Sequence, residues 1–550
     1  MFSTMNVLFA AALASAAMQS PAAAQDGVSP ILRIDEHTSV PRAIAHYEPV
    51  RLGGPRGSGD PCCDAPVVID GAGYARHGQS VPGGGTLSPL AFINPAVISN
   101  AGMIAFVSDV SGSSRNQGVF VSDGTTLTVI ARGCGGSGGS GLPGTCGDPT
   151  PIGGTFGGFF QGTFFAPPIN DNGDVLFLAD VANGSSPRGL FLYRADTGQI
   201  VKVAAVGDPS PIGGTITSVG PGSLNNNRTV AFLAYTSSTG YAGNYHKWEA
   251  GVVSTIARVG DAAPGGGTFS SLGRESVLFA DSTRVPVGPV PAINDAGQFA
   301  FGAVVSGGPV ERGILLSDGV THQWVARNTD VTPIGGNYFD FYGPVLNSAG
   351  QIAFYADVRF ANNTFSGGWF VATGTSHRKV LAFYDSLLGG QCFGLAVSRT
   401  PLRALDDCGA LTLWTSLRLA DLTDLETFLL ASPDGTITEL AHFGQSTPIG
   451  GLFGALNAWP TANDRRQSAL GAGTPGAPGG VLNAHFVYKG KMEADLDGDG
   501  SVNLGDLSAL LTNFGLSSGM SFEDGDLDGD GDVDLADLSA VLSRFGVSCW

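Results

Sequence analysis

A short phrase recurs along most of this 550-residue chain. It reads GQSVPGGGT at 78, GDPTPIGGT at 147, GDPSPIGGT at 207, GDAAPGGGT at 260, TDVTPIGGN at 329 and GQSTPIGGL at 444, with a degenerate copy, DSLLGGQCFG, at 385. Successive copies begin 53 to 69 residues apart. Seven units of this size indicate a repeat fold in which each unit is one supersecondary structure.

Two further phrases follow the first one in most units. One places an Asn/Asp/Gly turn before an alternating apolar run, as in INDNGDVLFLADV from 169 and LNSAGQIAFYADV from 346. The other is a hairpin around an Asp-Gly or Asp-Thr-Gly turn, as in GVFVSDGTTLTVIAR from 118. Tight hairpin turns need positive φ, which these residues tolerate. Each unit therefore predicts about four antiparallel strands.

The sequence predicts an all-β, seven-bladed β-propeller over residues 66–490. A single four-stranded sheet cannot bury both of its faces, whereas stacking in a ring can. The last unit stops where a final strand is expected, and PVVIDGAGYARHGQ at 66–79 resembles that missing strand. One blade built from both ends would close the ring without a free edge. An open solenoid or a pair of β-sandwiches are the alternatives.

The repeats also resemble a known group of proteins. Asn294–Phe301 and Asn347–Phe354 fit the pattern N-x-x-G-x-x-A-F, and Asn100–Phe106 is a variant one residue shorter. This pattern is similar to that of the exported bacterial tandem-repeat proteins named for the motif, which carry varied surface-anchoring tails. The resemblance implies an exported repeat domain and no established activity.

The C-terminal region, residues 491–550, differs sharply in charge. Residues 493–550 hold thirteen acidic residues and one base, so they carry −12 of the chain's net charge of −19. Within them, DLDGDGSVNLGD (495–506) and DLDGDGDVDLAD (526–537) are twelve-residue loops with Asp at positions 1, 3 and 5 and Gly at position 6. Ca²⁺ prefers six to eight oxygen ligands, which such loops supply. We expect two ions, bound by Asp495, Asp497, Asp499, Ser501, Asn503 and Asp506 and by Asp526, Asp528, Asp530, Asp532, Asp534 and Asp537. Ser501 and Asp532, at position 7, would contribute their backbone carbonyls.

Each loop precedes a predicted helix with one apolar face. The apolar residues are Leu507, Leu510, Leu511 and Phe514 in the first helix and Leu538, Val541, Leu542 and Phe545 in the second. Gly515 and Gly546 are placed to end these helices. No comparable helix precedes either loop. Two loop–helix units 31 residues apart resemble a small, EF-hand-like type I dockerin domain.

A dockerin implies a cohesin-like partner, although this chain departs from the cellulosomal pattern. Loop positions 10 and 11, which usually carry hydroxyl side chains, are Leu504-Gly505 and Leu535-Ala536. This argues against ordinary cohesin binding. The ending FGVSCW instead resembles the dockerin-like anchors of planctomycete-type bacteria, which finish near a terminal Cys. The resemblance implies a cell-envelope anchoring partner and makes Cys549 a candidate attachment point.

Residues 1–24 predict an export signal, followed by an N-terminal extension over 25–65. An apolar run from Val7 to Met18 precedes the A-x-A pattern at 22–24, and no later run is long enough for a transmembrane helix. Seven cysteines fit an oxidising, extracellular or cell-surface location. Spacing predicts the disulfides Cys134–Cys146 and Cys392–Cys408. Cys62 and Cys63 are left open, to pair with each other or elsewhere.

Motifs of catalysis are weak in this sequence. The acidic charge argues against a nucleic-acid partner, and the G-x-S-x-G match at 135–139 lies in a Gly/Ser-rich loop. We assign no catalytic residue. Asp109, Asp180 and Asp357 occupy one repeat position that favours a structural role, while the off-pattern acids are Glu249, Glu275, Glu311 and Glu426.

The predicted function is therefore a non-catalytic binding or display propeller, tethered by a calcium-binding tail. Its ligand would be a carbohydrate or a protein. A dockerin-bearing polysaccharide hydrolase or lyase and a structural envelope component are the alternatives.

Overall fold

The computed structural model describes most of the repeat region and much of the acidic C-terminal region. The described residues are 67–68, 73–88, 95–135, 146–160, 166–272, 276–278, 284–286, 290–395, 404–456, 459–464, 467–490, 494–497, 502–520, 524–528 and 530–546. The predicted export signal and extension, Cys62, Cys63, Cys549, Glu275 and the 135–139 motif beyond Gly135 lie outside them. Among the described residues, no helix has the length and apolar character needed to cross a membrane.

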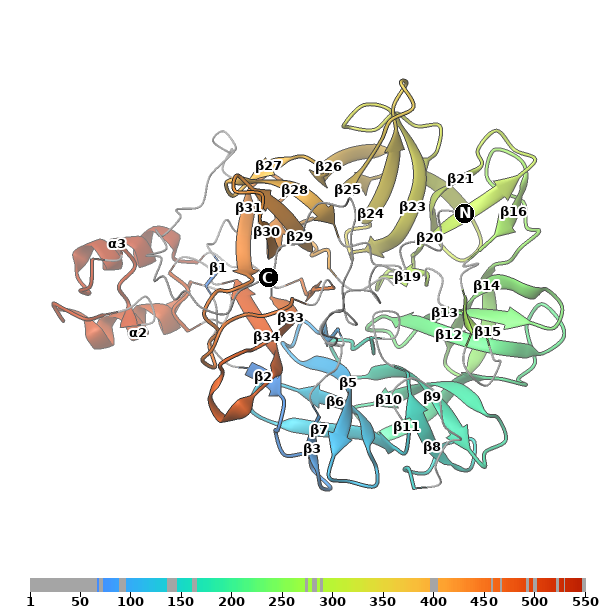
Figure 1. The fold of residues 1–550 in the computed structure, drawn as a ribbon, viewed down its shortest axis with the longest axis horizontal. Coiled ribbons are helices and arrows are strands. Elements are labelled where there is room, and N and C mark those ends of the chain that lie inside the picture. Colours follow the sequence, from blue (N-terminus) through green and yellow to red (C-terminus); the bar gives the residue numbers. More distant parts are fainter. Residues whose placement is uncertain are drawn as a thin grey trace, which may run out of the picture. The chain divides into compact units, whose positions relative to one another are not determined.

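The repeat region is a seven-bladed β-propeller, with seven antiparallel sheets arranged around a central axis (Figure 1). Blade 1 contains β3 (Thr86–Leu87), β4 (Val97–Ile98), β5 (Ile104–Ser111), β6 (Gln117–Ser122) and β7 (Leu127–Gly133). Blade 2 contains β8 (Thr155–Phe159), β9 (Val175–Ala182), β10 (Arg188–Arg194) and β11 (Gln199–Ala205). Blade 3 contains β12 (Ile216–Leu224), β13 (Val230–Thr236), β14 (Gly240–Glu249) and β15 (Val252–Ala257).

Blades 4 to 6 repeat the same strand order. Blade 4 contains β16 (Thr268–Ser271), β19 (Ala292–Ile293), β20 (Phe299–Ser306), β21 (Arg312–Ser317) and β22 (His322–Arg327). Blade 5 contains β23 (Asn337–Leu346), β24 (Ile352–Arg359), β25 (Phe365–Thr373) and β26 (Ser376–Ala382). Blade 6 contains β27 (Ser386–Leu387), β28 (Gly390–Leu395), β29 (Leu411–Leu419), β30 (Asp424–Ala431) and β31 (Ile437–His442). A separate hairpin, β17 (Ser276–Leu278) with β18 (Arg284–Pro286), is inserted in blade 4.

Blade 7 is built from both ends of the repeat region, as the sequence predicts. Its strands are β1 (Val67–Val68), β2 (Gly73–Arg76), β32 (Thr461–Ala462), β33 (Ser468–Gly473) and β34 (Asn483–Gly490), with a 3₁₀ turn η1 (Pro478–Gly480) between the last two. β2 pairs antiparallel with β34, so that Gly73 lies opposite Phe486 and Arg76 opposite Ala484. β1 adds to the same strand. This pairing closes the ring and excludes the open solenoid.

The blades pack through apolar surfaces that the alternating strands present on both sheet faces. Seven buried clusters follow one another around the ring, one at each interface between neighbouring blades. The cluster that joins blades 7 and 1 contains Tyr74 from β2 and Val487 from β34. Each blade therefore buries its two faces only because it has two neighbours, and the closing strand completes the last interface.

The phrase GDPxPIGG forms the tight loop that leads into each blade. Isolated bridges such as Pro149 with Thr155 and Pro209 with Thr215 close it. Its last glycine has positive φ, 71° at Gly154. A Cβ at Gly154 would collide with the carbonyl oxygen of Ala182. The recurrence of glycine here thus reflects both backbone conformation and close approach.

The asparagine that opens each NxxG turn links neighbouring blades. Asn294 Oδ1 accepts from the Gln298 amide at 2.9 Å, and Asn294 Nδ2 donates to the Asn347 carbonyl of the next blade at 3.1 Å. Four other asparagine side chains donate in the same way to a backbone carbonyl of the neighbouring blade. The pairs are Asn170 to Asn225, Asn225 to Asn294, Asn347 to Asp406, and Asn463 to Ser99. We call this set of five bonds the asparagine ring. Sequence alone shows these residues as turn formers, and the structure adds that they cross five blade interfaces.

The residue after each ring position adds a second layer of bonds. Asn100 donates from its backbone amide and its side chain to the Asp171 carboxylate, at 2.7 and 2.9 Å. Its side chain also donates to Asp464, at 2.7 Å. Asn226 bridges Asp171 and Asp295 in the same way. The acidic side chains at the inner ends of the blades therefore accept bonds from the neighbouring blade.

The structure confirms one predicted disulfide and corrects the other. Cys134 and Cys146 are bonded, with their Cα atoms 5.8 Å apart. Cys392 is a free, buried thiol, whereas Cys408 is disulfide-bonded. Cys392 lies in β28, opposite Leu417 near the end of β29, with its sulfur 3.3 Å from Thr415 Oγ1, while Cys408 lies in the turn just before β29 begins. The predicted Cys392–Cys408 pair is therefore wrong, because a strand's length separates its members.

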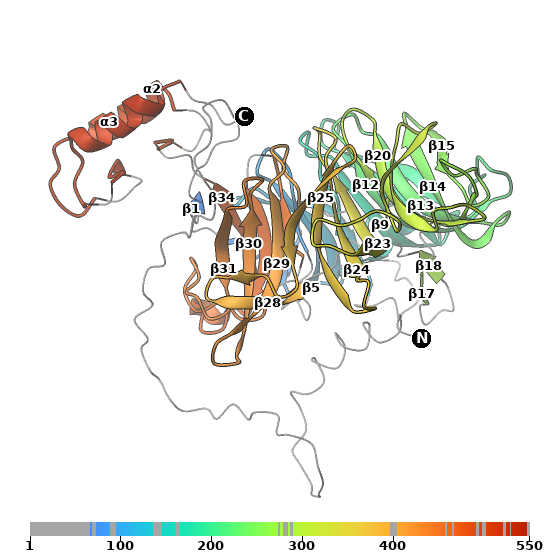
Figure 2. The same ribbon diagram turned by 90° about the horizontal axis from the view of Figure 1, so that it is seen from above.

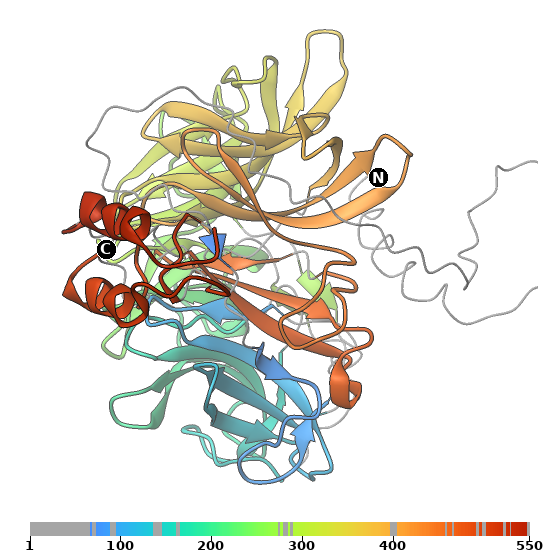
Figure 3. The same cartoon turned by 90° about the vertical axis from the view of Figure 1, so that its left-hand side faces the viewer.

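The C-terminal region forms two short helices, α2 (Leu504–Asn513) and α3 (Leu535–Arg544), which lie side by side (Figure 3). Gly515 and Gly546 follow them with φ of 87° and 85°, as expected for helix ends. The predicted apolar faces are divided in the structure. Leu510 and Val541 are buried between the helices and loops, while Leu511, Phe514, Leu542 and Phe545 are exposed.

Candidate metal centre

The last residue of each acidic loop is held by the backbone of its own loop. In the first loop, Asp506 Oδ1 accepts from the amides of Leu496 and Asp497, at 2.6 and 3.2 Å, and Asp506 Oδ2 accepts from Asn503, at 2.7 Å. The side chain is fully buried. Asp506 thus draws loop positions 2, 3 and 9 around one carboxylate.

The second loop repeats this arrangement 31 residues later. Asp537 Oδ1 accepts from Leu527 and Asp528, at 2.6 and 3.3 Å, and Asp537 Oδ2 accepts from Asp534, at 2.8 Å. Although burial opposes it, hydrogen bonds from the amides of Asp534, Leu527 and Asp528 hold the pKa of Asp537 below its usual value. The carboxylate at position 12 is therefore anionic and fixed in place.

Position 9 of each loop begins the following helix. Asn503 caps α2 by accepting from the Gly505 amide, and Asp534 caps α3 by accepting from the Ala536 amide, both at 2.6 Å. With Asp506 and Asp537 these residues complete two capping boxes. The helix start and the acidic loop are therefore one local structure, because the same side chains build both.

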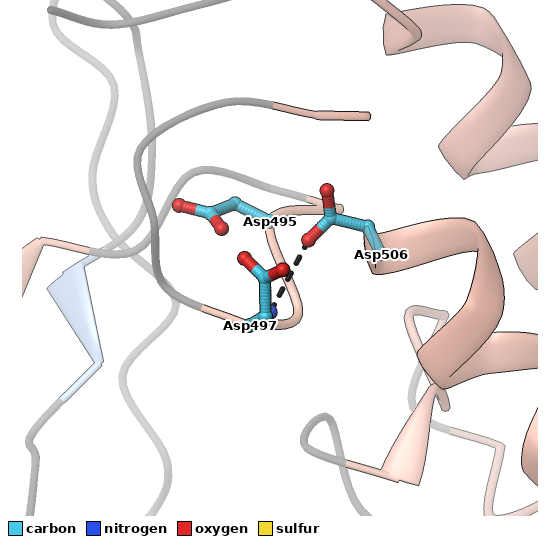
Figure 4. A group of neighbouring side chains, drawn as sticks. All are labelled: Asp495, Asp497 and Asp506. Carbon is cyan, nitrogen blue, oxygen red and sulfur yellow. Dashed lines mark hydrogen bonds between the residues drawn. The ribbon is translucent and has the colours of Figure 1, made fainter. Parts of the chain in front are cut away.

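The other acidic side chains gather beside these fixed carboxylates. Figure 4 shows Asp495 and Asp497 from the loop next to Asp506 at the first turn of α2. One oxygen of each lies within 4.8 Å of the others. The second loop gives two such groups, Asp526 with Asp528 and Asp530, and Asp532 with Asp534 and Asp537. Asp499 and Ser501 lie outside the described residues.

The second loop contains a carboxylate that the sequence analysis assigned only a backbone role. Asp532 occupies position 7, where we expected its carbonyl to serve, yet its side chain joins the group around Asp537. Its Oδ1 is buried without a hydrogen-bond partner in the described part of the chain. Burial and repulsion from Asp530, Asp534, Asp537 and Asp528 raise its pKa. This buried Asp532 oxygen, which has no hydrogen-bond donor in the described structure and lies among other carboxylates, is suited to bind a cation.

These contacts define what the arrangement can hold. The donor atoms among the described loop residues are all oxygen, from carboxylates and from Asn503. Hard cations such as Ca²⁺ and Mg²⁺ prefer oxygen, whereas Zn²⁺ prefers sulfur and nitrogen. The described residues thus fit a hard divalent cation in each loop.

The off-pattern glutamates do not form a shared site in the described structure. Glu249 and Glu311 are exposed, at the end of β14 and just before β21. Glu426 is half-buried in β30, where burial raises its pKa and the Leu456 amide donates to it. Asp109 and Asp180 bond to Gln117 and Arg188 of the adjacent strand, as structural residues would.

Asp357 differs from its repeat equivalents. It accepts from the Tyr342 hydroxyl at 3.2 Å and lies opposite Asp340 across β23 and β24. Burial raises the pKa of Asp357, against the hydrogen bond from Tyr342, and repulsion from Asp340 adds to the rise. A half-buried carboxyl and a second carboxylate on adjacent strands were not predicted, because one of them, Asp340, lies outside the repeated phrases.

A cavity of about 80 Å³ lies among the inner strands of blades 1 to 5. Its walls include apolar residues such as Ile293 and Leu346 and polar residues such as Asn226, Asp295 and Ser348. Asn226 and Asp295 are bonded to each other across a blade interface. The polar lining thus belongs to the bonds that join the blades.

Comparison with known proteins adds little about function. A family of unknown function, DUF7453, matches residues 145–280. No curated protein sequence matches the chain.

Several solved propeller structures are similar in fold. The propeller domain of the Trilobed protease from Pyrococcus furiosus is 9% identical, with 72% of this chain and 96% of that one covered and a TM-score of 0.38. A PL25 ulvan lyase is 10% identical (77% and 96% covered, TM-score 0.33). The GH93 α-L-arabinofuranosidase of Fusarium graminearum is 9% identical (59% and 91% covered, TM-score 0.29). Scores this low say nothing about what this chain binds.

Proposed function

We propose that the chain is an exported, non-catalytic binding protein whose propeller is attached to the cell surface through a calcium-loaded, dockerin-like tail. The observation that carries the proposal is the duplicated hydrogen-bond pattern around Asp506 and Asp537. Two loops that fold in the same way around oxygen donors favour a pair of equivalent ion sites over an unstructured acidic tail.

Ca²⁺ would be held in the first loop by Asp495, Asp497, Asp499, Asn503 and Asp506, with the Ser501 carbonyl. In the second loop the ligands would be Asp526, Asp528, Asp530, Asp534 and Asp537, with the carbonyl of Asp532 and, from the structure, its side chain as well. The bound ions supply positive charge that offsets repulsion among the carboxylates. The chain's own residues then pack α2 against α3.

The exposed faces of the two helices support an attachment role. Leu504 and Leu535 at loop position 10 are 72% and 71% exposed, and Phe514 and Phe545 are 41% and 44% exposed. Apolar side chains left in water at matching places on both helices suit a protein partner. The partner would be a cohesin-like or other envelope protein that recognises leucine where hydroxyl side chains are usual.

The disulfide supports an extracellular location. Disulfides persist in oxidising compartments, and Cys134–Cys146 closes a Gly/Ser-rich loop that has little apolar content of its own. This agrees with the expected export signal over residues 1–24 and with Cys549 as a candidate attachment point.

A polysaccharide hydrolase or lyase is the second candidate function. The observation that favours it is Asp357, whose raised pKa suits an acid, beside Asp340 and Tyr342. Turnover of a polysaccharide by the intact protein, lost in Asp357→Asn, would establish this alternative.

The proposal is tested by retention on the envelope fraction of the cells that produce the protein. We expect the intact chain to be retained with Ca²⁺, released by a chelator, and not retained in the Asp495→Ala/Asp526→Ala variant. Glu249→Gln, which changes an exposed propeller acid, is the matched control and should be retained. Retention that ignores the chelator would contradict calcium-dependent attachment.

A further inference from the structure

Two neighbouring blades carry exposed phenylalanines at the same repeat position. In every blade, one backbone amide near the start of the sheet donates to a carbonyl of the entry loop. In blade 5 this is the amide of Tyr338 in β23, and in blade 6 it is the amide of Cys392 in β28. The next residue is Phe339 or Phe393, 41% and 48% exposed. In the other five blades the corresponding residues are Ser88, Gly157, Thr217, Ser270 and Gly454. The fold itself therefore does not require an aromatic side chain there.

A third exposed phenylalanine lies beside Phe339 in blade 5. Phe365, at the start of β25, is 55% exposed, and its ring centroid lies 5.1 Å from that of Phe339 in an edge-to-face arrangement. Blades 5 and 6 are adjacent around the axis (Figures 1 and 2) and share one buried cluster. We call Phe339, Phe365 and Phe393 the aromatic surface. Apolar rings kept in water across two blades are typical of a binding surface.

Each repeated phenylalanine lies beside an arginine whose charge is already matched. The Arg312 guanidinium lies 5.9 Å from the Phe339 ring centroid and is ion-paired with Asp340 at 3.2 Å. The Arg418 guanidinium lies 4.1 Å from the Phe393 centroid and is ion-paired with Asp424 through two bonds. Both blades therefore offer a ring flanked by an ion-paired guanidinium and carboxylate, which supply hydrogen-bond donors and acceptors.

This combination fits one kind of ligand. The negative face of an aromatic ring attracts the slightly positive C–H groups on the flat side of a pyranose. Paired guanidinium and carboxylate groups can donate to and accept from hydroxyls on the rim of the sugar. A neutral ligand is favoured because both arginines beside the rings are already ion-paired, and an extended one because the rings repeat from blade to blade.

We propose that blades 5 and 6 bind a neutral pyranose polysaccharide across Phe365, Phe339 and Phe393. This deepens the proposed function, on which it rests, by assigning the class of ligand that the propeller holds. Sugar rings stack on the phenylalanines, and the Arg312–Asp340 and Arg418–Asp424 pairs bond to their hydroxyls.

The test is affinity gel electrophoresis of the intact protein, with Ca²⁺ present, in gels that contain mixed-linkage β-glucan, xyloglucan or galactomannan. At least one of these should retard the protein. Phe339→Ala and Phe393→Ala should each weaken binding about tenfold, and the double variant should abolish it. Phe339→Tyr, which keeps the ring, should bind within threefold of the parent. Val252→Ala, which changes an exposed apolar residue of blade 3, should bind normally.

Other outcomes overturn the inference. These are no retardation by any neutral polysaccharide, binding that ignores the phenylalanine variants, or salt-sensitive binding to alginate alone. Loss of envelope retention in Phe339→Ala without polysaccharide binding would indicate a protein partner instead. The Asp495→Ala/Asp526→Ala variant should still bind polysaccharide. Failure of the ligand assignment is thereby distinguished from failure of calcium-dependent attachment.

Discussion

The propeller and the tail differ in what fills their interiors. Among the described residues, each blade interface of the propeller buries a cluster of twelve to fourteen apolar residues, whereas the cluster in the tail has six. The tail also concentrates thirteen acidic side chains in its last 58 residues. Apolar burial is the main stabilising contribution to folding, and small domains seldom supply enough of it. The propeller therefore has a larger apolar interior at each blade interface than the described part of the tail has, and we propose that cations supply the stabilisation that the tail lacks.

The two regions also use polar groups differently. In the propeller, the asparagine ring joins side-chain amides to backbone carbonyls, and the second layer joins asparagine side chains to carboxylates. In the tail, Asp506 and Asp537 are satisfied by backbone amides, but their acidic neighbours repel one another. Fully satisfied polar networks rigidify a fold, whereas unpaired or mutually repelling buried polar groups are costly.

The largest effect is expected from the tail. Asp537→Ala would leave three backbone amides without their acceptor and remove a ligand, so calcium affinity of the second loop should fall at least a hundredfold. Titration calorimetry should then detect one ion in place of two. Glu311→Ala, an exposed propeller acid, is the control. Two ions bound with unchanged affinity would show that Asp537 has no role in binding.

The next effect concerns the asparagine ring. Asn294→Ala removes bonds to Gln298 and to the neighbouring blade from a buried site, and should lower the free energy of unfolding by about 2 to 4 kcal/mol. Asn227→Ala removes one exposed inter-blade bond and should cost about 1 kcal/mol or less. Denaturant melts compare the two. Equal, small effects would mean that the ring does not hold the blades together.

A further expected effect is a pH dependence of the propeller's stability. Burial lowers the pKa of His246 and of His485 to about 4, from an ordinary value of 6.5. Unfolding lets each take up a proton between these values, so stability is intact above pH 6.5 and falls as pH drops toward 4. The loss should be about 2 kcal/mol per histidine at pH 5.

The variants that check this are His246→Phe and His485→Leu. Phe191 and Leu190 occupy the corresponding positions of blade 2, so both replacements suit the fold. The melting temperature of the double variant should change less between pH 7 and pH 5 than that of the parent. An unchanged pH profile would show that other groups cause the acid sensitivity.

Much of the architecture could be predicted because it depends on short sequence phrases that recur at regular intervals. The recurring loop phrase gave the number of blades, and PVVIDGAGYARHGQ indicated the strand that became β2. The loops at 495–506 and 526–537 were predicted as structured units because their residues act within twelve positions of one another. Their ion content stays a prediction.

What could not be predicted depends on contacts between distant residues. Asn294 meets Asn347 only because neighbouring blades align their turns, and no single repeat reveals that partner. The Cys392–Cys408 prediction failed because nearness in sequence said nothing about opposite ends of a strand. Phe339 and Phe393 became informative only when the strand register showed them to be equivalent.

We propose that calcium orders the tail independently of the propeller. Differential scanning calorimetry of the intact chain, with Ca²⁺ and with chelator, tests it most directly. We predict two transitions with Ca²⁺, of which the smaller one disappears on chelation and in Asp495→Ala/Asp526→Ala, while the propeller transition stays within a degree or so of its position. A single transition that shifts as a whole would contradict the account.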